Sequence, residues 1–228
     1  MPDISIYLVT AFAAYLLGSI PTGYLVARVK GVDIRSVGSG NIGATNAMRV
    51  LGKPAGIFVL LMDALKGYAA CALLAPFVFH LLGVKVYELA KFGPPPACVM
   101  ENRNNILAGI CAVLGHNYTC WLKFKGGKGI ATTAGVFLAL APWAVLIALV
   151  VFILALLLTK YVSVASMSAA VALPAAVWLL TPQNILLGVI ATALGIMAIY
   201  KHKGNIQRLM AGTENRVGKK SSTTDNAK

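Results

Sequence analysis

The stretch WAVLIALVVFILALLLT, residues 143–159, decides the class of fold, because it is apolar throughout and contains no charged side chain. A run of this kind is typical of a helix that crosses a membrane. The whole chain agrees, since its 228 residues are 58% hydrophobic and only 12% charged. Soluble domains carry about 25% charged residues. We therefore expect an all-α integral membrane protein.

Seven apolar runs, separated by Gly, Pro and charged clusters, predict about seven transmembrane helices. The expected ranges are 4–27, 55–83, 104–119, 129–141, 143–159, 164–180 and 184–200. Several are shorter than the ~20 residues that a straight span needs. Some loops are therefore expected to dip into the bilayer.

The basic residues predict the orientation, because Lys and Arg gather on the cytoplasmic side of a membrane. With the N-terminus outside and the C-terminus cytoplasmic, four loops face the cytoplasm and hold 16 of the 20 basic residues. These loops are 28–53, 120–128, 160–163 and 201–228. The net charge of +13 therefore has a topological meaning first, and nucleic acid is not an expected partner.

The four cysteines do not predict a metal site or a cofactor. Cys71 and Cys111 lie in apolar runs, Cys98 in a loop and Cys120 at a helix end. No pair has the spacing of metal ligands, so we interpret them as small hydrophobic residues.

The first cytoplasmic loop, VGSGNIGATNAMRVLGK (37–53), has the composition of an anion site. Small residues let backbone amides converge on an anion, and hydroxyl and amide side chains add donors. A polar turn followed by a helix cap is the alternative, but it explains only one or two of these residues. The candidate residues are Ser39, Gly40, Asn41, Thr45, Asn46 and Arg49.

The second loop, GHNYTCWLKFKGGKGIATT (115–133), places Lys128 among Gly126, Gly127 and Gly129 just before a predicted helix. The glycines would let backbone amides face a ligand, and a helix N-terminus adds about half a positive charge. A nucleotide-binding P-loop is excluded, because it needs glycine at position 122 and Ser or Thr at position 129. The chain has Leu122 and Gly129 there. Lys123 and Lys125 are expected to have only a topological role.

Two further polar segments lie at cytoplasmic turns. In TKYVSVAS (159–166), Ser163 and Ser166 would share a helix face, either to bind a ligand or to bond backbone. In YKHKGNIQRLMAGTENR (200–216), His202 and Asn205 would share a face if the last helix continues. A solvated basic tail is the alternative for this segment. Glu214 could neutralise a neighbouring arginine or hold the loop.

Asp63 and Lys66 lie three residues apart inside the second apolar run, where an unpaired charge is costly. We expect a structural ion pair. His116, at the end of the third run, is also expected to be structural.

Taken together, these motifs resemble the bacterial acyl-phosphate-dependent glycerol-3-phosphate acyltransferases. The similarity covers nearly the whole chain, with mild departures at loop 84–103, Asn117 and Cys120. The matching stretches are SGNIGATNAMR (39–49), DALKG (63–67), GHNYTCWLKFKGGKGIAT (115–132), YVSVAS (161–166) and HKGNIQRLMAGTENR (202–216).

The resemblance implies a multi-pass enzyme of the bacterial inner membrane with its active site toward the cytoplasm. Its substrates would be acyl phosphate and glycerol 3-phosphate, its product lysophosphatidic acid, and a partner could be the enzyme that makes acyl phosphate. Residues 1–200 would form one catalytic membrane domain, 201–216 would complete the site, and 217–228 would be a disordered tail. The resemblance implies catalytic roles for Ser39, Arg49, Lys128, His202 and Asn205. Substrate binding falls to Gly40, Asn41, Thr45, Asn46, Gly126, Gly127, Gly129, Ser163, Ser166 and Glu214.

The H-x-x-x-x-D pair of other glycerolipid acyltransferases is absent. The residues five after His80, His116 and His202 are Lys85, Trp121 and Gln207. Proton abstraction by the phosphate of the acyl phosphate itself is therefore plausible. His202 remains open as a base or a hydrogen-bonding residue.

Two other functions are considered. A transporter of a phosphorylated small anion would bind it near the midplane on broken helices, whereas these motifs all map to one face. A module that docks a partner through its basic tail would leave the Ser39 and Lys128 loops unexplained.

Overall fold

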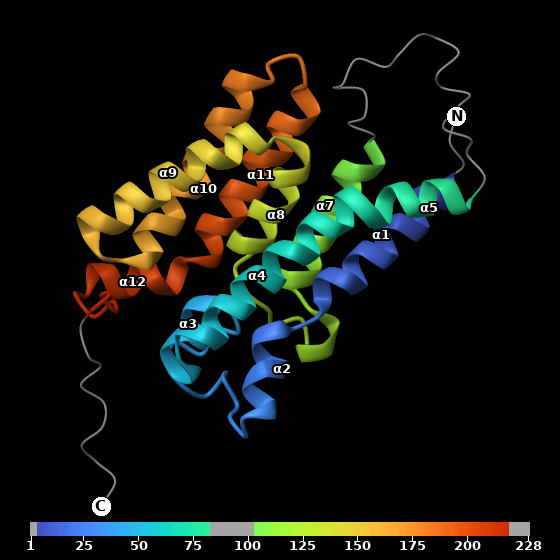
Figure 1. The fold of residues 1–228 in the computed structure, drawn as a ribbon. Helices are drawn as coiled ribbons and strands as arrows, with labels where there is room; N and C mark the ends of the chain where they lie inside the picture. Colours follow the sequence, from blue (N-terminus) through green and yellow to red (C-terminus); the bar gives the residue numbers. More distant parts are fainter. Residues whose placement is uncertain (1–3, 83–102, 219–228) are drawn as a thin grey trace, which may run out of the picture. The chain divides into compact units, whose positions relative to one another are not determined.

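The structure is a computed structural model that describes residues 4–82 and 103–218. Its regular elements in these residues are all helical (Figure 1), which confirms the predicted all-α class. Each of the seven predicted ranges contains a helix. The outer loop up to residue 102 and the tail from residue 219 lie outside the described residues.

Four helical segments in the described part of the chain are long and apolar enough to cross a membrane. They are Ile4–Val29, Lys53–Leu81, Pro142–Thr159 and Val162–Leu180. A fifth is added if Ile185–Lys201 and Lys203–Met210, bent by 51°, count as one span. The chain is therefore a multi-pass membrane protein, while the count of seven spans stays a prediction.

The chain divides into two compact units, 1–142 and 143–228. The first unit begins with α1 (Ile4–Ser19) and α2 (Thr22–Val29), where the sequence predicted one helix over 4–27. The break falls at Ile20 and Pro21. Proline has no N–H to donate and its ring clashes with the preceding turn. At the break, the carbonyl of Ile20 accepts the N–H of Thr22 at 3.0 Å.

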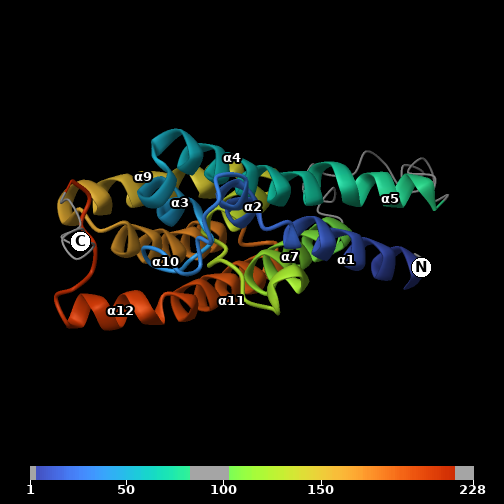
Figure 2. The same cartoon turned by 90° about the horizontal axis from the view of Figure 1, so that it is seen from below.

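After a loop, α3 (Ala44–Leu51) lies beside α4 (Lys53–Ala69), as Figure 2 shows. The same long segment continues through a π-helical turn, η1 (Ala70–Leu74), into α5 (Ala75–Leu81). Pro76 stands in the first turn of α5. Its missing N–H accounts for the widened turn before it.

The remaining elements of the first unit are α7 (Arg103–Asn117), a 3₁₀ turn η3 (Cys120–Leu122) and α8 (Ile130–Leu140). Helix α8 packs so closely against α4 that the contact positions have no room for a side chain. A Cβ at Gly67 would overlap the carbonyl oxygen of Thr132, and a Cβ at Gly135 would overlap that of Ala64. In a membrane, such small residues let helices approach closely.

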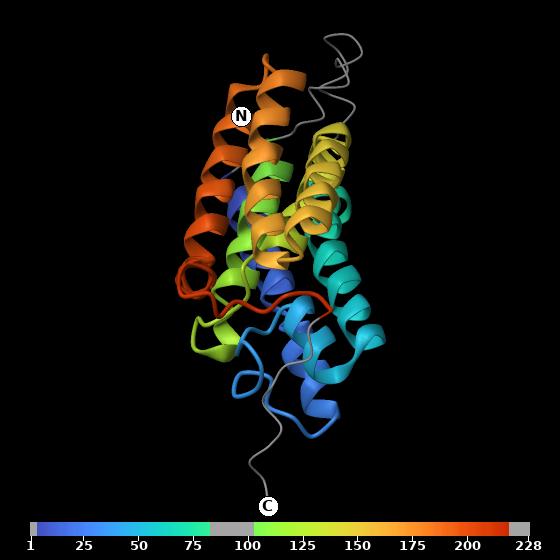
Figure 3. The same ribbon diagram turned by 90° about the vertical axis from the view of Figure 1, so that its left-hand side faces the viewer.

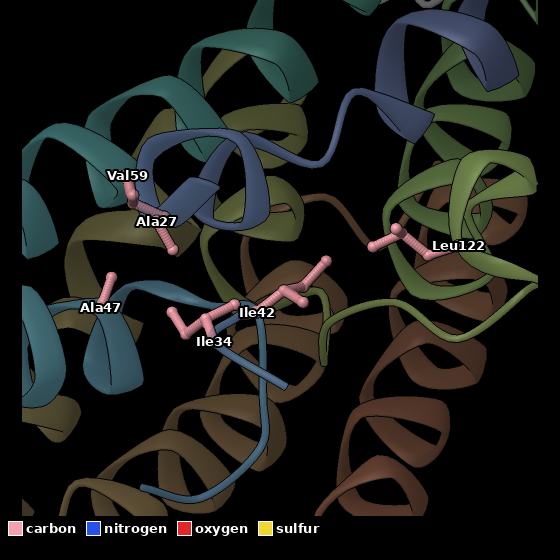
Figure 4. Packing of buried hydrophobic residues seen from close by; sticks show 6 residues of the cluster. All are labelled: Ala27, Ile34, Ile42, Ala47, Val59 and Leu122. Atoms are coloured by element: carbon pink, nitrogen blue, oxygen red, sulfur yellow. The ribbon is translucent and has the colours of Figure 1, made fainter. Parts of the chain in front are cut away.

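Apolar side chains hold the long loop between α2 and α3 in place. Ile34 and Ile42 from this loop are buried next to each other (Figure 4). The cluster is formed by Ala27, Ile34, Ile42, Ala47, Val59 and Leu122. It joins α2, α3 and α4 to the turn that begins the second motif, so both polar loops of this unit share one apolar base.

The second unit contains α9 (Pro142–Thr159), α10 (Val162–Leu180), α11 (Ile185–Lys201) and α12 (Lys203–Met210). Helices α10 and α11 run side by side (Figure 3), and Trp178 Nε1 donates to Thr192 Oγ1 between them at 3.1 Å. After α12 the chain returns to the start of α10, where the N–H of Val217 donates to the carbonyl of Lys160 at 2.8 Å.

Candidate active site

The first polar loop is folded around the side chain of Asn46. Its Oδ1 accepts the N–H of Ser39 at 2.9 Å, and its Nδ2 lies within hydrogen-bond distance of three backbone carbonyls. These belong to Ile34, Val37 and Asn41. Asn46 is 1% exposed, so its bonds define the loop. Its predicted contact with substrate stays a prediction.

Around this centre the loop presents Ser39 and Gly40 at the surface. Gly38 and Gly40 have φ of 66° and 69°, the left-handed region that glycine favours. Thr45 and Arg49 follow on α3, both exposed, and four residues apart they share one helix face. The loop thus displays a hydroxyl-bearing turn next to a helix face with a guanidinium.

The second loop lies over the C-terminal end of α7. The N–H of Gly126 donates to the carbonyl of Asn117 at 3.2 Å, and the N–H of Gly127 donates to that of His116 at 2.9 Å. The prediction that these two backbone amides face a ligand is therefore wrong, because both bond the end of α7. Gly129, with φ of 82°, precedes the first turn of α8. Lys128 is half-buried between them, whereas Lys123 and Lys125 are exposed. This difference in burial agrees with the separate role predicted for Lys128.

A buried charged cluster supports this loop. Lys66 Nζ lies 2.7 Å from Asp63 Oδ1, which confirms the predicted ion pair. The same Nζ donates to His116 Nδ1 at 2.9 Å and to the carbonyl of Ile20 at 3.0 Å. The side chains of Asp63, Lys66 and His116 are each 6% exposed or less. The carbonyl of Ile20, at the break between α1 and α2, therefore also accepts a hydrogen bond from this lysine.

In the second unit, Glu214 gathers two predicted residues, Ser163 and Asn205, together with Arg208. Its Oε1 accepts from Ser163 Oγ at 3.0 Å and from Asn205 Nδ2 at 2.7 Å. Its Oε2 forms an ion pair with Arg208 Nε at 2.7 Å. The prediction that Glu214 could neutralise an arginine or hold the loop is confirmed in both respects.

These bonds also set the charge of Glu214. Partial burial alone would raise the pKa of its carboxyl group. The hydrogen bonds from Asn205, Arg208 and Ser163 outweigh this effect and hold the pKa below its ordinary value of 4.5. Glu214 is thus a carboxylate at neutral pH.

His202 lies at the bend between α11 and α12, whereas the predicted shared face of His202 and Asn205 was conditional on a helix that continues past the membrane. Its ring Nδ1 is 2.7 Å from the carbonyl of Ala198 and donates to it. The N–H of His202 bonds the carbonyl of Ile199 instead, at 2.9 Å. Because Nδ1 carries the proton, Nε2 is the acceptor in the neutral ring.

Ser163 and Ser166 are both buried in the first turns of α10.

Two features of the site were not anticipated from the sequence. The contact of His116 with Lys66 joins residues fifty positions apart, and Asn46 takes partners from three places in its loop. Gly127 leaves room for the His116 ring, which is a signal for the contact of this histidine with the loop but not for its contact with Lys66. Among the described residues, no group of three His, Cys, Asp or Glu side chains could hold a metal ion.

The family model for glycerol-3-phosphate acyltransferase matches residues 8–212 of the chain. The curated glycerol-3-phosphate acyltransferase of Geotalea daltonii is 43% identical over 210 residues, which cover 91% of this chain and 96% of that protein. The fold is similar to crystal structures of PlsY (YgiH), an integral membrane glycerol 3-phosphate acyltransferase. The glycerol 3-phosphate form gives a TM-score of 0.78 at 35% identity, covering 93% of this chain and 96% of that chain.

The lysophosphatidic acid form of the same protein gives a TM-score of 0.74 at 36% identity, covering 93% of this chain and 95% of that chain. Family match, identity and fold therefore agree over almost the full length. The chain belongs to the integral membrane glycerol-3-phosphate acyltransferase family.

Proposed function

We propose that this protein transfers a fatty acyl group from acyl phosphate to the sn-1 hydroxyl of glycerol 3-phosphate. The products are lysophosphatidic acid and inorganic phosphate, and the reaction is the first step of phospholipid synthesis. The solved relative supports the acceptor and the product, because its two crystal forms hold glycerol 3-phosphate and lysophosphatidic acid.

The observation that carries the proposal is the half-buried Lys128 within a glycine loop at the start of α8. A lysine and a helix N-terminus both favour a phosphate at this place. The Ser39 loop offers a second set of donors, with Arg49 on the adjacent helix. Both substrates carry a phosphate, so two sets of donors match the reaction.

The chemistry needs no covalent enzyme intermediate. The sn-1 hydroxyl oxygen attacks the carbonyl carbon of the acyl phosphate, and the bond from that carbon to the phosphate oxygen breaks. The hydroxyl proton passes to the phosphate, which leaves as inorganic phosphate. The protein then supplies position and positive potential. His202 Nε2 is an acceptor that could orient the hydroxyl.

The Glu214 cluster serves this reaction by orienting its partners. A carboxylate repels phosphate, so we assign Glu214 to holding Ser163 and Asn205 in place. Ser166, in the next turn of α10, belongs to the same face as Ser163. This refines the expectation that Glu214 belongs to the substrate-binding residues, since its effect on the substrate is indirect.

The same proposal includes the arrangement in the bacterial inner membrane. The positive charge of the loops favours an N-terminus outside and an active site that faces the cytoplasm. We retain seven membrane helices, one catalytic membrane domain over residues 1–200 and a contribution to the site from 201–216. The substrates are then drawn from the cytoplasm and the inner leaflet.

Donor specificity tests the proposal. Purified protein in detergent receives glycerol 3-phosphate with palmitoyl phosphate, palmitoyl-coenzyme A or palmitoyl-acyl carrier protein, without magnesium or ATP. Lysophosphatidic acid should form only with palmitoyl phosphate, together with an equal amount of phosphate, and added phosphate should inhibit. The thioesters lack a phosphate on the carbonyl that could take the proton. Robust turnover with a thioester as sole donor would overturn the mechanism and point to His202 as a protein base.

A further inference from the structure

The cluster of Asp63, Lys66 and His116 lies directly beneath the Lys128 loop and does not belong to any set of substrate donors described above. His116 contacts the loop in two ways. Its backbone carbonyl accepts the N–H of Gly127, and its imidazole fills the space in which a side chain at position 127 would lie. The atoms that a Cβ at Gly127 would meet are Nε2, Cε1 and Cδ2 of this ring.

The imidazole itself is held from below. Lys66 Nζ donates to His116 Nδ1 at 2.9 Å, and Asp63 Oδ1 lies 3.5 Å from the same nitrogen. Lys66 is fixed in turn by Asp63 and by the carbonyl of Ile20. The ring therefore has a defined position, because three segments of the chain converge on the lysine that binds it.

The other side of the loop rests on the same stretch of α4. Helix α8 begins directly after Gly129, and its contacts with α4 flank the charged pair: Gly135 meets the carbonyl of Ala64, and Gly67 meets that of Thr132. Residues 63–67 thus support the loop before Lys128, through His116, and the helix after it. Because both ends of the loop are supported in this way, the loop has little freedom to move toward or away from α4.

We propose that Asp63, Lys66 and His116 are positioning residues, which set the place of Lys128 through the imidazole beneath Gly127. The inference rests on the proposed function, in which Lys128 holds a substrate phosphate. A displacement of about 1 Å at such a contact lowers the rate by roughly 100-fold. The cluster thus affects catalysis without touching the substrate.

A double-mutant cycle between Gly127 and His116 isolates this contact. Gly127→Ala pushes the loop off the ring and should lower kcat/KM by about 100-fold. His116→Asn keeps an acceptor for Lys66 but removes the outer ring atoms. In that background Gly127→Ala should cost less than about threefold, which is far from additive. Additive losses would overturn the proposal.

Gly126 supplies the matched control. A Cβ there would overlap backbone atoms of His116 and Asn117 and not the imidazole. Gly126→Ala should therefore cost the same with His116 or Asn at position 116. Equal rescue of both glycine variants would mean that His116→Asn merely loosens the loop, and this too would overturn the proposal.

A second set of variants tests the ion pair. Asp63→Asn and Lys66→Met each leave one buried charge alone and could fail to fold, but the double variant removes both charges. In the folded double variant, the KM that rises should be that of the same substrate whose KM rises in Lys128→Ala. A structural role alone would lower the active fraction with both KM values unchanged, and would overturn the assignment.

The proposed function of the Lys128 loop and the positioning role of the cluster can be contradicted separately. Full activity of Lys128→Ala would contradict the proposed function of the loop. Loss of activity in Lys128→Ala, combined with additive Gly127 and His116 variants, would contradict only the positioning role. Thermal unfolding in detergent, recorded for every variant, shows that the compared proteins are folded. A Gly127→Ala protein that folds only in the His116→Asn background would also support the contact.

Discussion

Lys128 and Lys123 lie five positions apart in one loop, yet their surroundings differ. Lys128 is half-buried, and Lys123 is exposed with a left-handed φ of 54°. Lys128→Ala and Arg49→Ala should each lower kcat/KM by at least ~100-fold, because charge-assisted hydrogen bonds to the substrate phosphates are lost. Lys123→Ala should change it little. Phosphate release from palmitoyl phosphate and glycerol 3-phosphate measures all three.

Similar losses in the three variants would show that bulk positive charge matters and that the loop has no special phosphate site. Salt offers a separate check, since an exposed charge is screened at high ionic strength and a half-buried one much less. The loss of activity caused by Lys128→Ala should therefore depend only weakly on salt.

At the same scale, Glu214 makes stability depend on pH. Its pKa in the folded protein is lowered, so it stabilises the fold fully above its ordinary pKa of 4.5. The contribution is lost as the pH falls through the lowered value. Glu214→Gln should lower the melting temperature at pH 7, and the difference from wild type should shrink in acid. Thermal unfolding in detergent from pH 7 to pH 3 measures it. A constant difference across this range would contradict the ionic role.

At the scale of helices, the contact of α4 with α8 depends on glycine. Gly135→Ala places a methyl group on the carbonyl of Ala64, and overpacking of this kind costs about 1–3 kcal/mol of unfolding free energy. Gly204→Ala is the control, because the nearest atom within 4 Å is the flexible end of Arg208. Melting temperatures in detergent should fall only for Gly135→Ala. An unchanged melting temperature for Gly135→Ala would mean that α4 and α8 can move apart without loss of stability.

The sequence predicted the helices well and their interruptions poorly. Apolar runs mark helices because burial in lipid requires satisfied backbone groups. Pro21 is a readable signal for a break, although the apolar composition of 4–27 favours one long helix. The bend at His202 has no comparable signal, since it depends on whether the ring bonds its own helix at Ala198. Such a choice is made by tertiary surroundings and not by local sequence.

In the site, too, the sequence indicates residue types but not the partners that these residues bond. The sequence predicts an anion site because a polar turn and a helix cap explain only one or two residues of the first loop. The internal partners of these residues were not predicted, because Asn46 could bond a ligand or its own loop with equal chemistry. The structure assigns its amide to the loop, and gives Glu214 to Ser163, Asn205 and Arg208.

For the whole molecule, the orientation in the membrane is the main prediction. The 16 basic residues of the four predicted cytoplasmic loops predict a cytoplasmic C-terminus. A reporter active only in the cytoplasm, fused after Gly218, should be active, and one active only outside should be silent there. The same reporters fused ahead of Ile4 should give the reverse. If the same reporter were active at both ends, both termini would lie on one side of the membrane. This result would require an even number of spans and would contradict the predicted topology.

The placement of Asp63 and Lys66 on one helix also matters while the protein is being made. Synthesis releases the segment 53–81 before His116 exists, and a lone charge at a helix centre costs about 2.5–3.5 kcal/mol on entering the membrane. Because the pair is spaced i, i+3, this helix brings its own counter-ion to the translocon. The exchange Leu65→Lys with Lys66→Leu keeps the composition but turns the ammonium group away from Asp63. The inserted fraction of the isolated segment should fall in a translocon assay, so the residues that later support the loop first ease the entry of their own helix.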